Sequence, residues 1–314
     1  MLRSPPRYSD PSLPPLDDAD RKLIAMLASD GRASGRDLAQ QTGISEANVS
    51  RRLARLIEER SVRIVGFVPP EVLGLEVQFA VHMRVRGSVD AAAEGLLKHP
   101  EFSYVVGCFG EDDMIAYGVV EDGLALNALL DRAIRGNPLL YGVRTETVLA
   151  FAGTERLAGG PAVPRSIDRT DRLIIREVQR DGRISFTDIA QRTGISATSA
   201  ADRFRRLLGE GTVRILTLPD PTRVDLHLSG LIQFRLSQPL SAAFPKLGAF
   251  PELSFLSSCT GRISAQCEFN VRDEAHFDEL RGRLLAVPGV EALGVNILRR
   301  VYRQSFEWGS IPAE

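Results

Sequence analysis

The chain has 314 residues and a formal net charge of −1, with hydrophobic residues at 44% and charged residues at 25%. This composition is typical of a soluble globular protein with a sizeable core, and the length predicts two or more domains of ~150 residues each. It excludes a chain that attracts nucleic acid through its overall charge, so any such contact must come from a local basic cluster.

The first predicted element is a helix over residues 17–28, preceded by a tail. Residues 1–15 are rich in Pro, Ser and Arg and lack the apolar core of a signal peptide, so we expect them to be disordered. In the helix, Asp17 and Asp20 suit the positive N-terminal end. Its core face is expected to consist of Leu23, Ile24 and Leu27.

Two further helices follow, separated by a glycine. Residues 34–41 are predicted to form a short helix with a capping-box-like start, Ser34 with Asp37. Gly43 can take the left-handed conformation that ends this helix, and Ser45 is a good N-cap for the next one. The arrangement predicts a helix-turn-helix whose second helix is the recognition helix.

The predicted recognition helix, residues 45–57, has an apolar and a polar face. Its apolar face is Val49, Leu53, Leu56 and Ile57. The opposite face carries Asn48, Arg51, Arg52 and Arg55. A charged helix face is often simply solvated, but arginine and asparagine also bind phosphates and base edges. We therefore interpret this face as a candidate DNA-contacting surface.

Strand patterns come next. Residues 62–68 are β-like, stop at Pro69-Pro70, and are predicted to form a wing beside the recognition helix. Residues 78–86 alternate strictly, which predicts a strand with one buried and one exposed face. The inward residues are Phe79, Val81, Met83 and Val85, and the outward ones are Gln78, His82, Arg84 and Arg86.

The rest of this half predicts a second domain. We expect a helix over 89–98, strands near 104–109 and 114–120, a helix around 124–134 and a strand near 143–151. The order β-α-β-β-α-β is the ferredoxin-like motif. Residues 152–166, with Gly159-Gly160-Pro161 and Pro164, are predicted to be a linker.

The whole pattern occurs twice, at an offset of 151 residues that carries Ser45 to Ser196 and Cys108 to Cys259. Asp30-Gly31-Arg32 likewise matches Asp181-Gly182-Arg183. We infer a tandem duplication. The predicted fold class is α+β, with two copies of a winged helix-turn-helix followed by a βαββαβ ferredoxin-like domain. The winged helices span 16–68 and 167–219, the ferredoxin-like domains span 72–151 and 223–304, and a tail spans 305–314.

A winged helix followed by βαββαβ, with the string G-I-S-x-x-x-V-x-x-R-L-x-x-L from Gly43 to Leu56, resembles the Lrp/AsnC (leucine-responsive, feast/famine) family of transcriptional regulators. The likeness covers nearly the whole chain, once per half. It implies a partner in double-stranded DNA, an amino acid or related small effector at the interface of the βαββαβ domains, and assembly into homo-oligomers. It implies no catalytic residue and no cofactor.

The resemblance and the polar helix faces together predict the DNA-contacting residues. They are Ser45, Asn48, Arg51, Arg52, Arg55 and Arg63 in the first half, and Ser196, Ser199, Arg203 and Arg206 in the second. The second recognition helix has diverged, because Asp202 replaces Arg51 and phosphates repel an aspartate. We expect the first helix to read sequence and the second to hold phosphate or read a different half-site.

The resemblance also places the family's effector site near a G-x-x-D turn, which corresponds to Gly110, Glu111, Asp112 and Asp113. Asp112 and Asp113 are candidates to bind the ammonium of an amino acid, and an ordinary polar turn is the alternative. Ser264 stands where the second half would carry Asp113, which puts effector binding there in doubt.

Two other functions stay open. The same pair of domains, also fused in tandem, is similar to siroheme decarboxylases, which bind a tetrapyrrole in the corresponding cleft. Those enzymes look richer in histidine and aromatic residues near the turn, where this chain has Tyr104, Phe109 and Tyr117 but no histidine. The other possibility is an architectural DNA binder that has lost its effector.

Cysteine and histidine usage bounds the remaining chemistry. Cys108, Cys259 and Cys267 are odd in number and form no C-x-x-C, so we expect core residues in a reducing cytoplasm rather than a disulfide framework. The histidines show no ligand spacing, so no metal is expected: His82, His99, His227 and His276. No apolar run reaches membrane-span length, so no membrane partner is expected.

Overall fold

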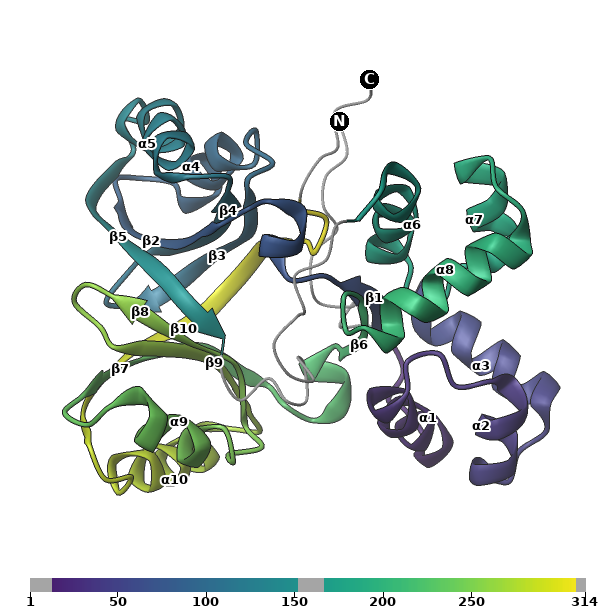
Figure 1. Ribbon diagram of the computed structural model, residues 1–314. Coiled ribbons are helices and arrows are strands. Elements are labelled where there is room, and N and C mark those ends of the chain that lie inside the picture. Colours follow the sequence, from purple (N-terminus) through teal and green to yellow (C-terminus); the bar gives the residue numbers. More distant parts are fainter. Residues whose placement is uncertain (1–12, 152–166, 309–314) are drawn as a thin grey trace. The chain divides into compact units, whose positions relative to one another are not determined.

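The computed structural model describes residues 13–151 and 167–308 (Figure 1). The predicted linker at 152–166 and most of the two predicted tails lie outside the described residues. The chain divides into two compact units, and each unit combines a segment from both halves of the sequence. We call residues 13–73 with 167–224 the helical unit, and residues 74–151 with 225–308 the barrel unit.

The helical unit repeats one element order. Its first half has α1 (Asp18–Ser29), α2 (Gly35–Thr42), α3 (Glu46–Glu58), β1 (Val62–Phe67) and a 3-10 turn (Pro70–Leu73). Its second half has α6 (Arg169–Arg180), α7 (Phe186–Thr193), α8 (Ala197–Gly209), β6 (Arg214–Pro219) and a 3-10 turn (Pro221–Val224). Ser34 and Ser45 cap α2 and α3 by accepting backbone N–H groups, and Gly43 ends α2 at φ 74°.

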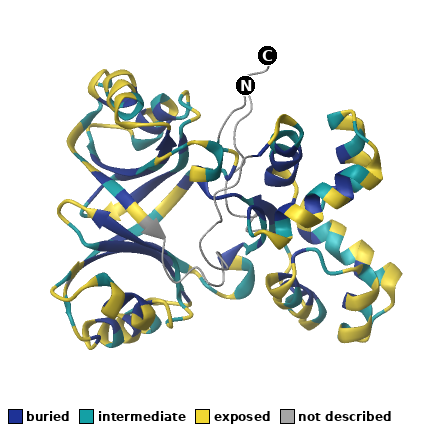
Figure 2. Cartoon of the chain, in the orientation of Figure 1, coloured by how far each residue is buried: buried dark blue, intermediate teal, exposed yellow. Residues whose placement is uncertain are grey.

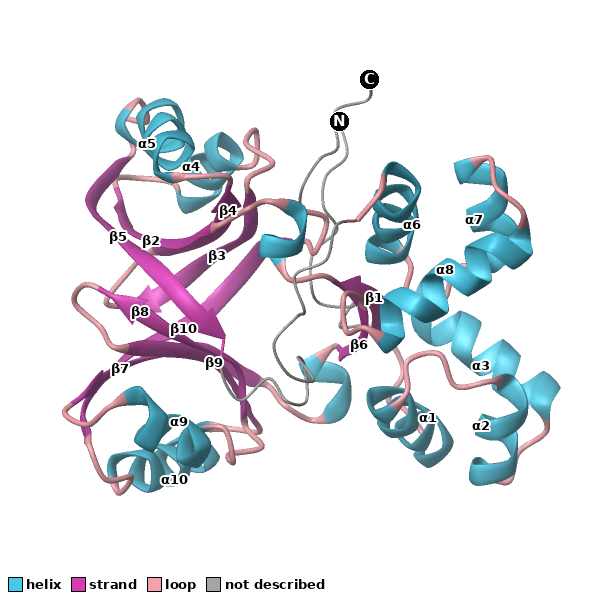
Figure 3. Cartoon of the chain, in the orientation of Figure 1, coloured by secondary structure: helices cyan, strands magenta, loops and turns pink. Residues whose placement is uncertain are grey.

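The predicted wing strand, β1, pairs with its equivalent in the other half of the sequence. β1 packs on the core of its own half, where Val62 and Ile64 join Val49 and Leu56 of α3, and it pairs antiparallel with β6, with Ile64 opposite Thr217. Figure 3 shows this two-stranded sheet among the helices of the unit. Pro69 and Pro70 end β1 before the chain can return as a second strand, so its free edge is satisfied by the equivalent strand of the other half.

The apolar face of α3 is also narrower than predicted. Val49 and Leu56 are fully buried and Leu53 packs against the same core, but Ile57 is 41% exposed. Ile57 is the second-last residue of the helix, which ends at Glu58.

The barrel unit repeats a β-α-β-β-α-β order. Its first half has β2 (Val77–Val85), α4 (Val89–Leu96), β3 (Phe102–Gly110), β4 (Met114–Val120), α5 (Gly123–Leu130), a π turn (Asp131–Arg135) and β5 (Leu140–Phe151). Its second half has β7 (Leu228–Leu236), α9 (Leu240–Leu247), β8 (Leu253–Thr260), β9 (Ala265–Val271), α10 (Glu274–Leu285) and β10 (Val290–Gln304).

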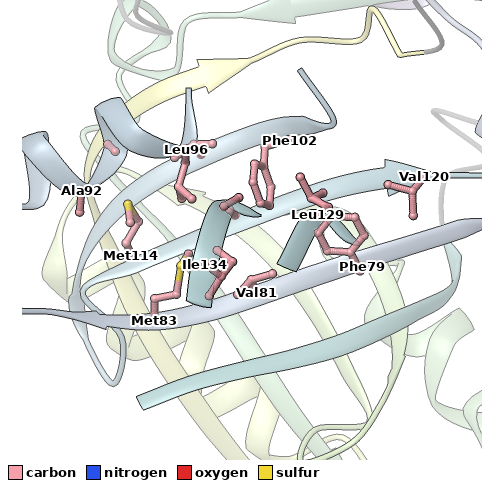
Figure 4. Close-up of a cluster of buried hydrophobic side chains, with 14 residues drawn as sticks. Phe79, Val81, Met83, Ala92, Leu96, Phe102, Met114, Val120, Leu129 and Ile134 are labelled. Atoms are coloured by element: carbon pink, nitrogen blue, oxygen red, sulfur yellow. The ribbon is translucent and has the colours of Figure 1, made fainter. Parts of the chain in front are cut away.

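The strands of this unit close into one barrel in the order β10-β3-β4-β2-β5-β8-β9-β7. Each half contributes four neighbouring strands, and the pairs β5–β8 and β10–β3 join the halves. Helices cover the outside, where one apolar core lies under α4 and α5 and a second under α9 and α10. Figure 4 shows the first core, in which Phe79, Phe102 and Leu129 meet, and Figure 2 shows both buried and exposed stretches along the strands of the barrel.

Closure of the barrel buries one residue of the predicted outward face, His82, whereas Arg86 is exposed as predicted and Gln78 and Arg84 are half-buried. In β2 the residues predicted inward do pack under the helices, but His82 is fully buried rather than exposed. Gln233, at the equivalent position of β7, is also buried. The side of each sheet that alternation marks as polar faces the barrel interior, so residues near the middle of the strand, such as His82 and Gln233, are removed from water.

Candidate nucleic-acid interface and effector site

Part of the polar face of α3 is open to solvent. Ser45, Ser50 and Arg51 are exposed and Asn48 is half-buried. The Arg51 guanidinium donates to the Asn48 side-chain oxygen at 2.9 Å, so the two side chains act as one hydrogen-bonding group. These residues can present donors and acceptors to base edges or phosphates.

Arg52 and Arg55, also predicted to contact DNA, form ion pairs within the chain. Arg52 Nη1 lies 2.7 Å from Asp17 and 2.8 Å from Asp20 of α1, and Arg55 Nη2 lies 2.5 Å from Asp20. Arg55 also reaches Glu59 at 3.2 Å. The Asp20 side chain is only 3% exposed, so these arginines neutralise a carboxylate at the contact of α1 with α3.

The second half repeats this network. Arg203 Nη1 lies 2.6 Å from Asp168 and 2.9 Å from Asp171, and Arg206 reaches Asp171 at 3.2 Å. Two predicted DNA-contacting arginines in each half therefore hold the first helix against the recognition helix. The local spacing could have revealed this, because both halves carry an acidic pair three residues apart at the start of the first helix.

The exposed face of α8 differs in charge from that of α3. Ser196 is exposed, Ser199 is half-buried, and Asp202 forms an ion pair with Arg205 at 2.5 Å. The ion pair between Asp202 and Arg205 has no net charge, whereas Arg51, at the position of α3 equivalent to Asp202, carries a positive charge. Arg63, also predicted to contact DNA, is half-buried on β1 opposite Leu218.

Two arginines tie the halves of the helical unit together. Arg32 donates to the carbonyl oxygens of Gly182 at 2.7 Å and Ile184 at 3.2 Å. Arg183 donates in return to Gly31 at 2.8 Å and Ala33 at 3.0 Å. We call this reciprocal pair the arginine clasp. The repeated Asp-Gly-Arg string was visible in the sequence, but nothing in it indicated that each arginine reaches the other half.

In the arginine clasp, Arg32 also contacts two aromatic rings that have no counterpart around Arg183. Its removal should therefore destabilise the protein more than removal of Arg183. Its guanidinium lies 4.8 Å from the Phe204 ring and 5.2 Å from the Phe186 ring, whereas Gly35 and Leu53 occupy the matching positions around Arg183. We expect Arg32→Ala to lower the free energy of unfolding by about 2–3 kcal/mol and the matched Arg183→Ala by about 1–2 kcal/mol. Urea unfolding followed by circular dichroism measures both, and equal losses would show that the rings contribute nothing.

The predicted effector turn is largely engaged within the chain. Asp112 is fully buried; its carboxylate accepts from Arg144 at 2.7 Å and lies 3.0 Å from His82 Nδ1, and its N–H donates to Asn296 at 2.8 Å. Burial alone would raise the pKa of Asp112, but the hydrogen bonds from His82 and Arg144 outweigh it and lower that pKa. Asp112 is thus engaged within the chain, and its contact with an effector stays a prediction.

The other turn residues have structural partners too. The Asp113 side chain accepts a hydrogen bond from the Val85 N–H at 2.9 Å, and the Ser264 side chain accepts one from the equivalent Leu236 N–H at 3.2 Å. The two residues therefore make the same structural hydrogen bond in their halves. Glu111 pairs with Arg262 of the second half at 2.5 Å. Gly110 has φ 147°, and a Cβ there would meet the carbonyl oxygen of Val295 at 2.4 Å.

A histidine does lie beside this turn, although its distance in sequence concealed it. His82 Nδ1 is 3.0 Å from Asp112 and 3.0 Å from the side-chain amide of Gln233. His82 and Gln233 are equivalent residues of the two halves, and only closure of the barrel brings them together. Asn296, from the last strand, was not singled out either, since a lone asparagine in a β pattern carries no signal.

The remaining chemistry-bearing residues are inert or scattered. All three cysteines are buried, and burial raises the pKa of each thiol, that of Cys259 to about 12. Within the described ranges no three His, Cys, Asp or Glu residues group as metal ligands. No helix in the described part of the chain is long and apolar enough to cross a membrane.

Both helix-turn-helix segments match models of known DNA-binding domain families. A winged helix-turn-helix DNA-binding model matches residues 16–60, and an AsnC-type helix-turn-helix model matches residues 167–208. The chain is 31% identical over 137 residues to the HTH-type transcriptional regulator FL11 of Pyrococcus horikoshii, covering 43% of this chain and 90% of that protein. It is 29% identical over 147 residues to the leucine-responsive regulatory protein of Escherichia coli, covering 45% and 90%.

Among solved structures, the siroheme decarboxylase NirDL is similar over most of its length. The TM-score is 0.64 at 13% identity, covering 92% of this chain and 93% of NirDL. At this identity the likeness establishes a shared fold, with two helix-turn-helix segments and two ferredoxin-like segments in one chain, and not a shared activity.

Proposed function

The chain belongs to the Lrp/AsnC family, and from this premise we propose that it is a sequence-specific DNA-binding transcriptional regulator whose two halves act as a single-chain pseudo-dimer. One observation carries the proposal: α3 keeps a solvent-facing group after its other arginines pair with α1, with Ser45, Ser50 and Arg51 exposed and Asn48 half-buried. A buried or fully paired face could not approach a duplex.

The two recognition helices have unequal roles in this proposal. α3 reads base edges through Asn48 and Arg51, because asparagine and arginine match adenine and guanine edges bidentately. α8 supports the complex with Ser196 and Arg205 near the phosphates, where Asp202 limits its affinity. The preferred site is an imperfect palindrome with only one half strongly specified.

Replacing Arg51 tests this proposal. We expect Arg51→Ala to weaken binding to a selected DNA site about 5- to 50-fold and to relax specificity there. Arg205→Ala in α8 is the control, expected to weaken binding by no more than about 3-fold, because Arg205 is already paired with Asp202. Gel-shift titrations at fixed salt give both values. Binding by the wild-type chain that Arg51→Ala leaves unchanged would contradict the proposal.

We also propose that a small effector binds the barrel unit and changes DNA binding. Amino acids are the first compounds to test. An effector changes DNA affinity only by favouring one arrangement of the protein over another. The proposal also includes homo-oligomers of whole chains acting in the cytoplasm. Light scattering with and without DNA measures the oligomer, and a titration with each amino acid in the gel shift identifies the effector.

Tetrapyrrole binding is a second candidate, favoured by the fold shared with NirDL and by His82 inside the barrel. It ranks second because His82 is fully buried and its Nδ1 faces Asp112, so a tetrapyrrole reaches the ring only if the barrel opens. Adding siroheme to the purified chain distinguishes the two: a Soret shift that His82→Ala abolishes supports this candidate, and an unchanged spectrum ends it.

A further inference from the structure

The two halves of the helical unit share a sheet and exchange residues between their cores. β1 and β6 are six residues each and pair over their full length. Val68 of the first half is fully buried in the core formed by α6, α7 and α8, and Ile215 of the second half packs against the core formed by α1, α2 and α3. A movement of one half relative to the other would therefore disrupt the sheet and open both cores.

Two glycines let the backbones of the halves approach closely. A Cβ on Gly66 of β1 would lie 2.9 Å from the carbonyl oxygen of Val178 in α6. Gly182 donates its N–H to the Ile64 carbonyl oxygen at 2.8 Å, and a Cβ on Gly182 would lie 3.0 Å from the Val65 nitrogen. Because no side chain separates these backbones, the contact defines the arrangement of the two halves closely.

The arginine clasp connects this contact to a recognition helix. Arg32 lies between α1 and α2 of the first half and donates to the carbonyl oxygens of Gly182 and Ile184 in the second. Its guanidinium also lies 4.8 Å from the ring of Phe204, which belongs to α8. Phe204 is 1% exposed and forms part of the core of the second half. A residue of the first half therefore contacts the recognition helix of the second.

This contact is made in one direction. Arg183 makes the reciprocal hydrogen bonds of the clasp, but Leu53 occupies the position in α3 that Phe204 has in α8. A leucine offers no π face to a guanidinium, so the cation–π attraction acts on α8 and not on α3. Arg32 is half-buried, and removal from water strengthens such an attraction. Arg32 thus links α8 to the half that contains α3.

We propose that Arg32 is a positioning residue, which fixes α8 relative to α3 through the Phe204 ring and thereby sets one separation between the two DNA segments that these helices contact. A recognition helix contacts DNA only where it meets the groove at the correct point along and around the duplex. The support that α8 gives therefore depends on where it is held. The inference rests on the proposed function in one respect, namely that both helices approach the same duplex.

The distance between the two helices can be measured in the free, full-length chain. Ala47→Cys and Thr198→Cys place spin labels at equivalent exposed positions of α3 and α8. The natural cysteines are buried, so the label attaches to the new thiols. Pulsed electron paramagnetic resonance should give a narrow distribution of label distances, which Arg32→Ala broadens and the matched Arg183→Ala leaves narrow. A distribution that is broad from the start, or that Arg32→Ala leaves unchanged, would overturn the inference.

Two further variants separate positioning from simple stabilisation of the fold. Phe204→Leu gives α8 the residue that α3 has at the equivalent position and keeps an apolar side chain in the core, so it tests the inference even if Arg32→Ala does not fold. It should broaden the distance distribution as Arg32→Ala does. Arg32→Lys keeps a positive charge over the ring and should restore a narrow distribution. A clasp that only stabilises the fold would leave the distribution narrow in every folded variant.

Hydroxyl-radical footprints of unlabelled chains on a selected DNA site test the consequence for binding. The wild-type chain should protect two segments at a constant separation, one under each recognition helix. In Arg32→Ala the protection under α8 should fall about 3-fold relative to that under α3, as expected from the loss of one cation–π contact. Protection under α8 equal to that of wild type would contradict the inference. Failure of the proposed function would appear separately, as a wild-type chain that leaves no footprint while its label distances still respond to Arg32→Ala.

Discussion

Replacing Asp20 with alanine is expected to lower the free energy of unfolding of the helical unit by about 2–4 kcal/mol. The carboxylate is 3% exposed and accepts from both Arg52 and Arg55, so its loss leaves two partly buried guanidinium groups without their main partner. Asp171 holds the same position against Arg203 and Arg206, and Asp171→Ala should cost a similar amount.

Asp18→Ala is the matched control for Asp20→Ala, because it removes the same charge from the same helix at an exposed position. It should cost about 0.3–1 kcal/mol through the helix dipole. Denaturant unfolding followed by far-UV circular dichroism compares the variants. If Asp20→Ala and Asp18→Ala cost the same, the arginines do not depend on Asp20, and their assignment as structural residues fails.

The second large effect is expected from Asp202→Arg, which should bind DNA more tightly than wild type. Asp202→Arg restores in α8 the residue that α3 has at the equivalent position, and it frees Arg205 from its ion pair. Removing a repelled carboxylate and adding phosphate or base contacts should tighten binding to a symmetric site about 10- to 200-fold. The slope of log affinity against log salt should steepen by about 1 for each additional phosphate that the variant binds.

Asp202→Ala separates the two contributions, because it removes the repulsion and introduces no new phosphate-binding group. Its affinity should fall between wild type and Asp202→Arg. Gel shifts over a series of salt concentrations measure the slope. If Asp202→Arg leaves both affinity and slope unchanged, α8 does not approach the phosphates and the pseudo-dimer model is wrong.

Local features of the fold were predictable from sequence, because the signals that set them lie within a few residues. Ser34 and Ser45 cap helices where their spacing predicted, and Gly43 takes the left-handed conformation expected of it. The alternation in β2 correctly indicated which residues pack under the helices. Such predictions need only the periodicity of apolar residues and the positions of helix-capping residues.

What was missed depends on pairings between residues far apart in sequence. The pairing of β1 with β6, the arginine clasp and the meeting of His82 with Gln233 all join the two halves. Alternation shows that His82 lies on the polar face of a strand, but not whether that face meets water or the inside of a closed barrel. Likewise, an arginine on a helix face looks the same in sequence whether it is free or paired with Asp20.

The most direct test of unequal recognition helices is a base-by-base scan. A DNA site selected by the full chain is varied one base pair at a time, and the affinity of each variant is measured at constant salt. We predict losses of about 5- to 150-fold per substituted pair in the half-site under α3, and losses below about 2-fold in the other half. Equal losses of affinity in both half-sites, or no loss at any position, would contradict a regulator that reads bases with α3 and contacts only phosphates with α8.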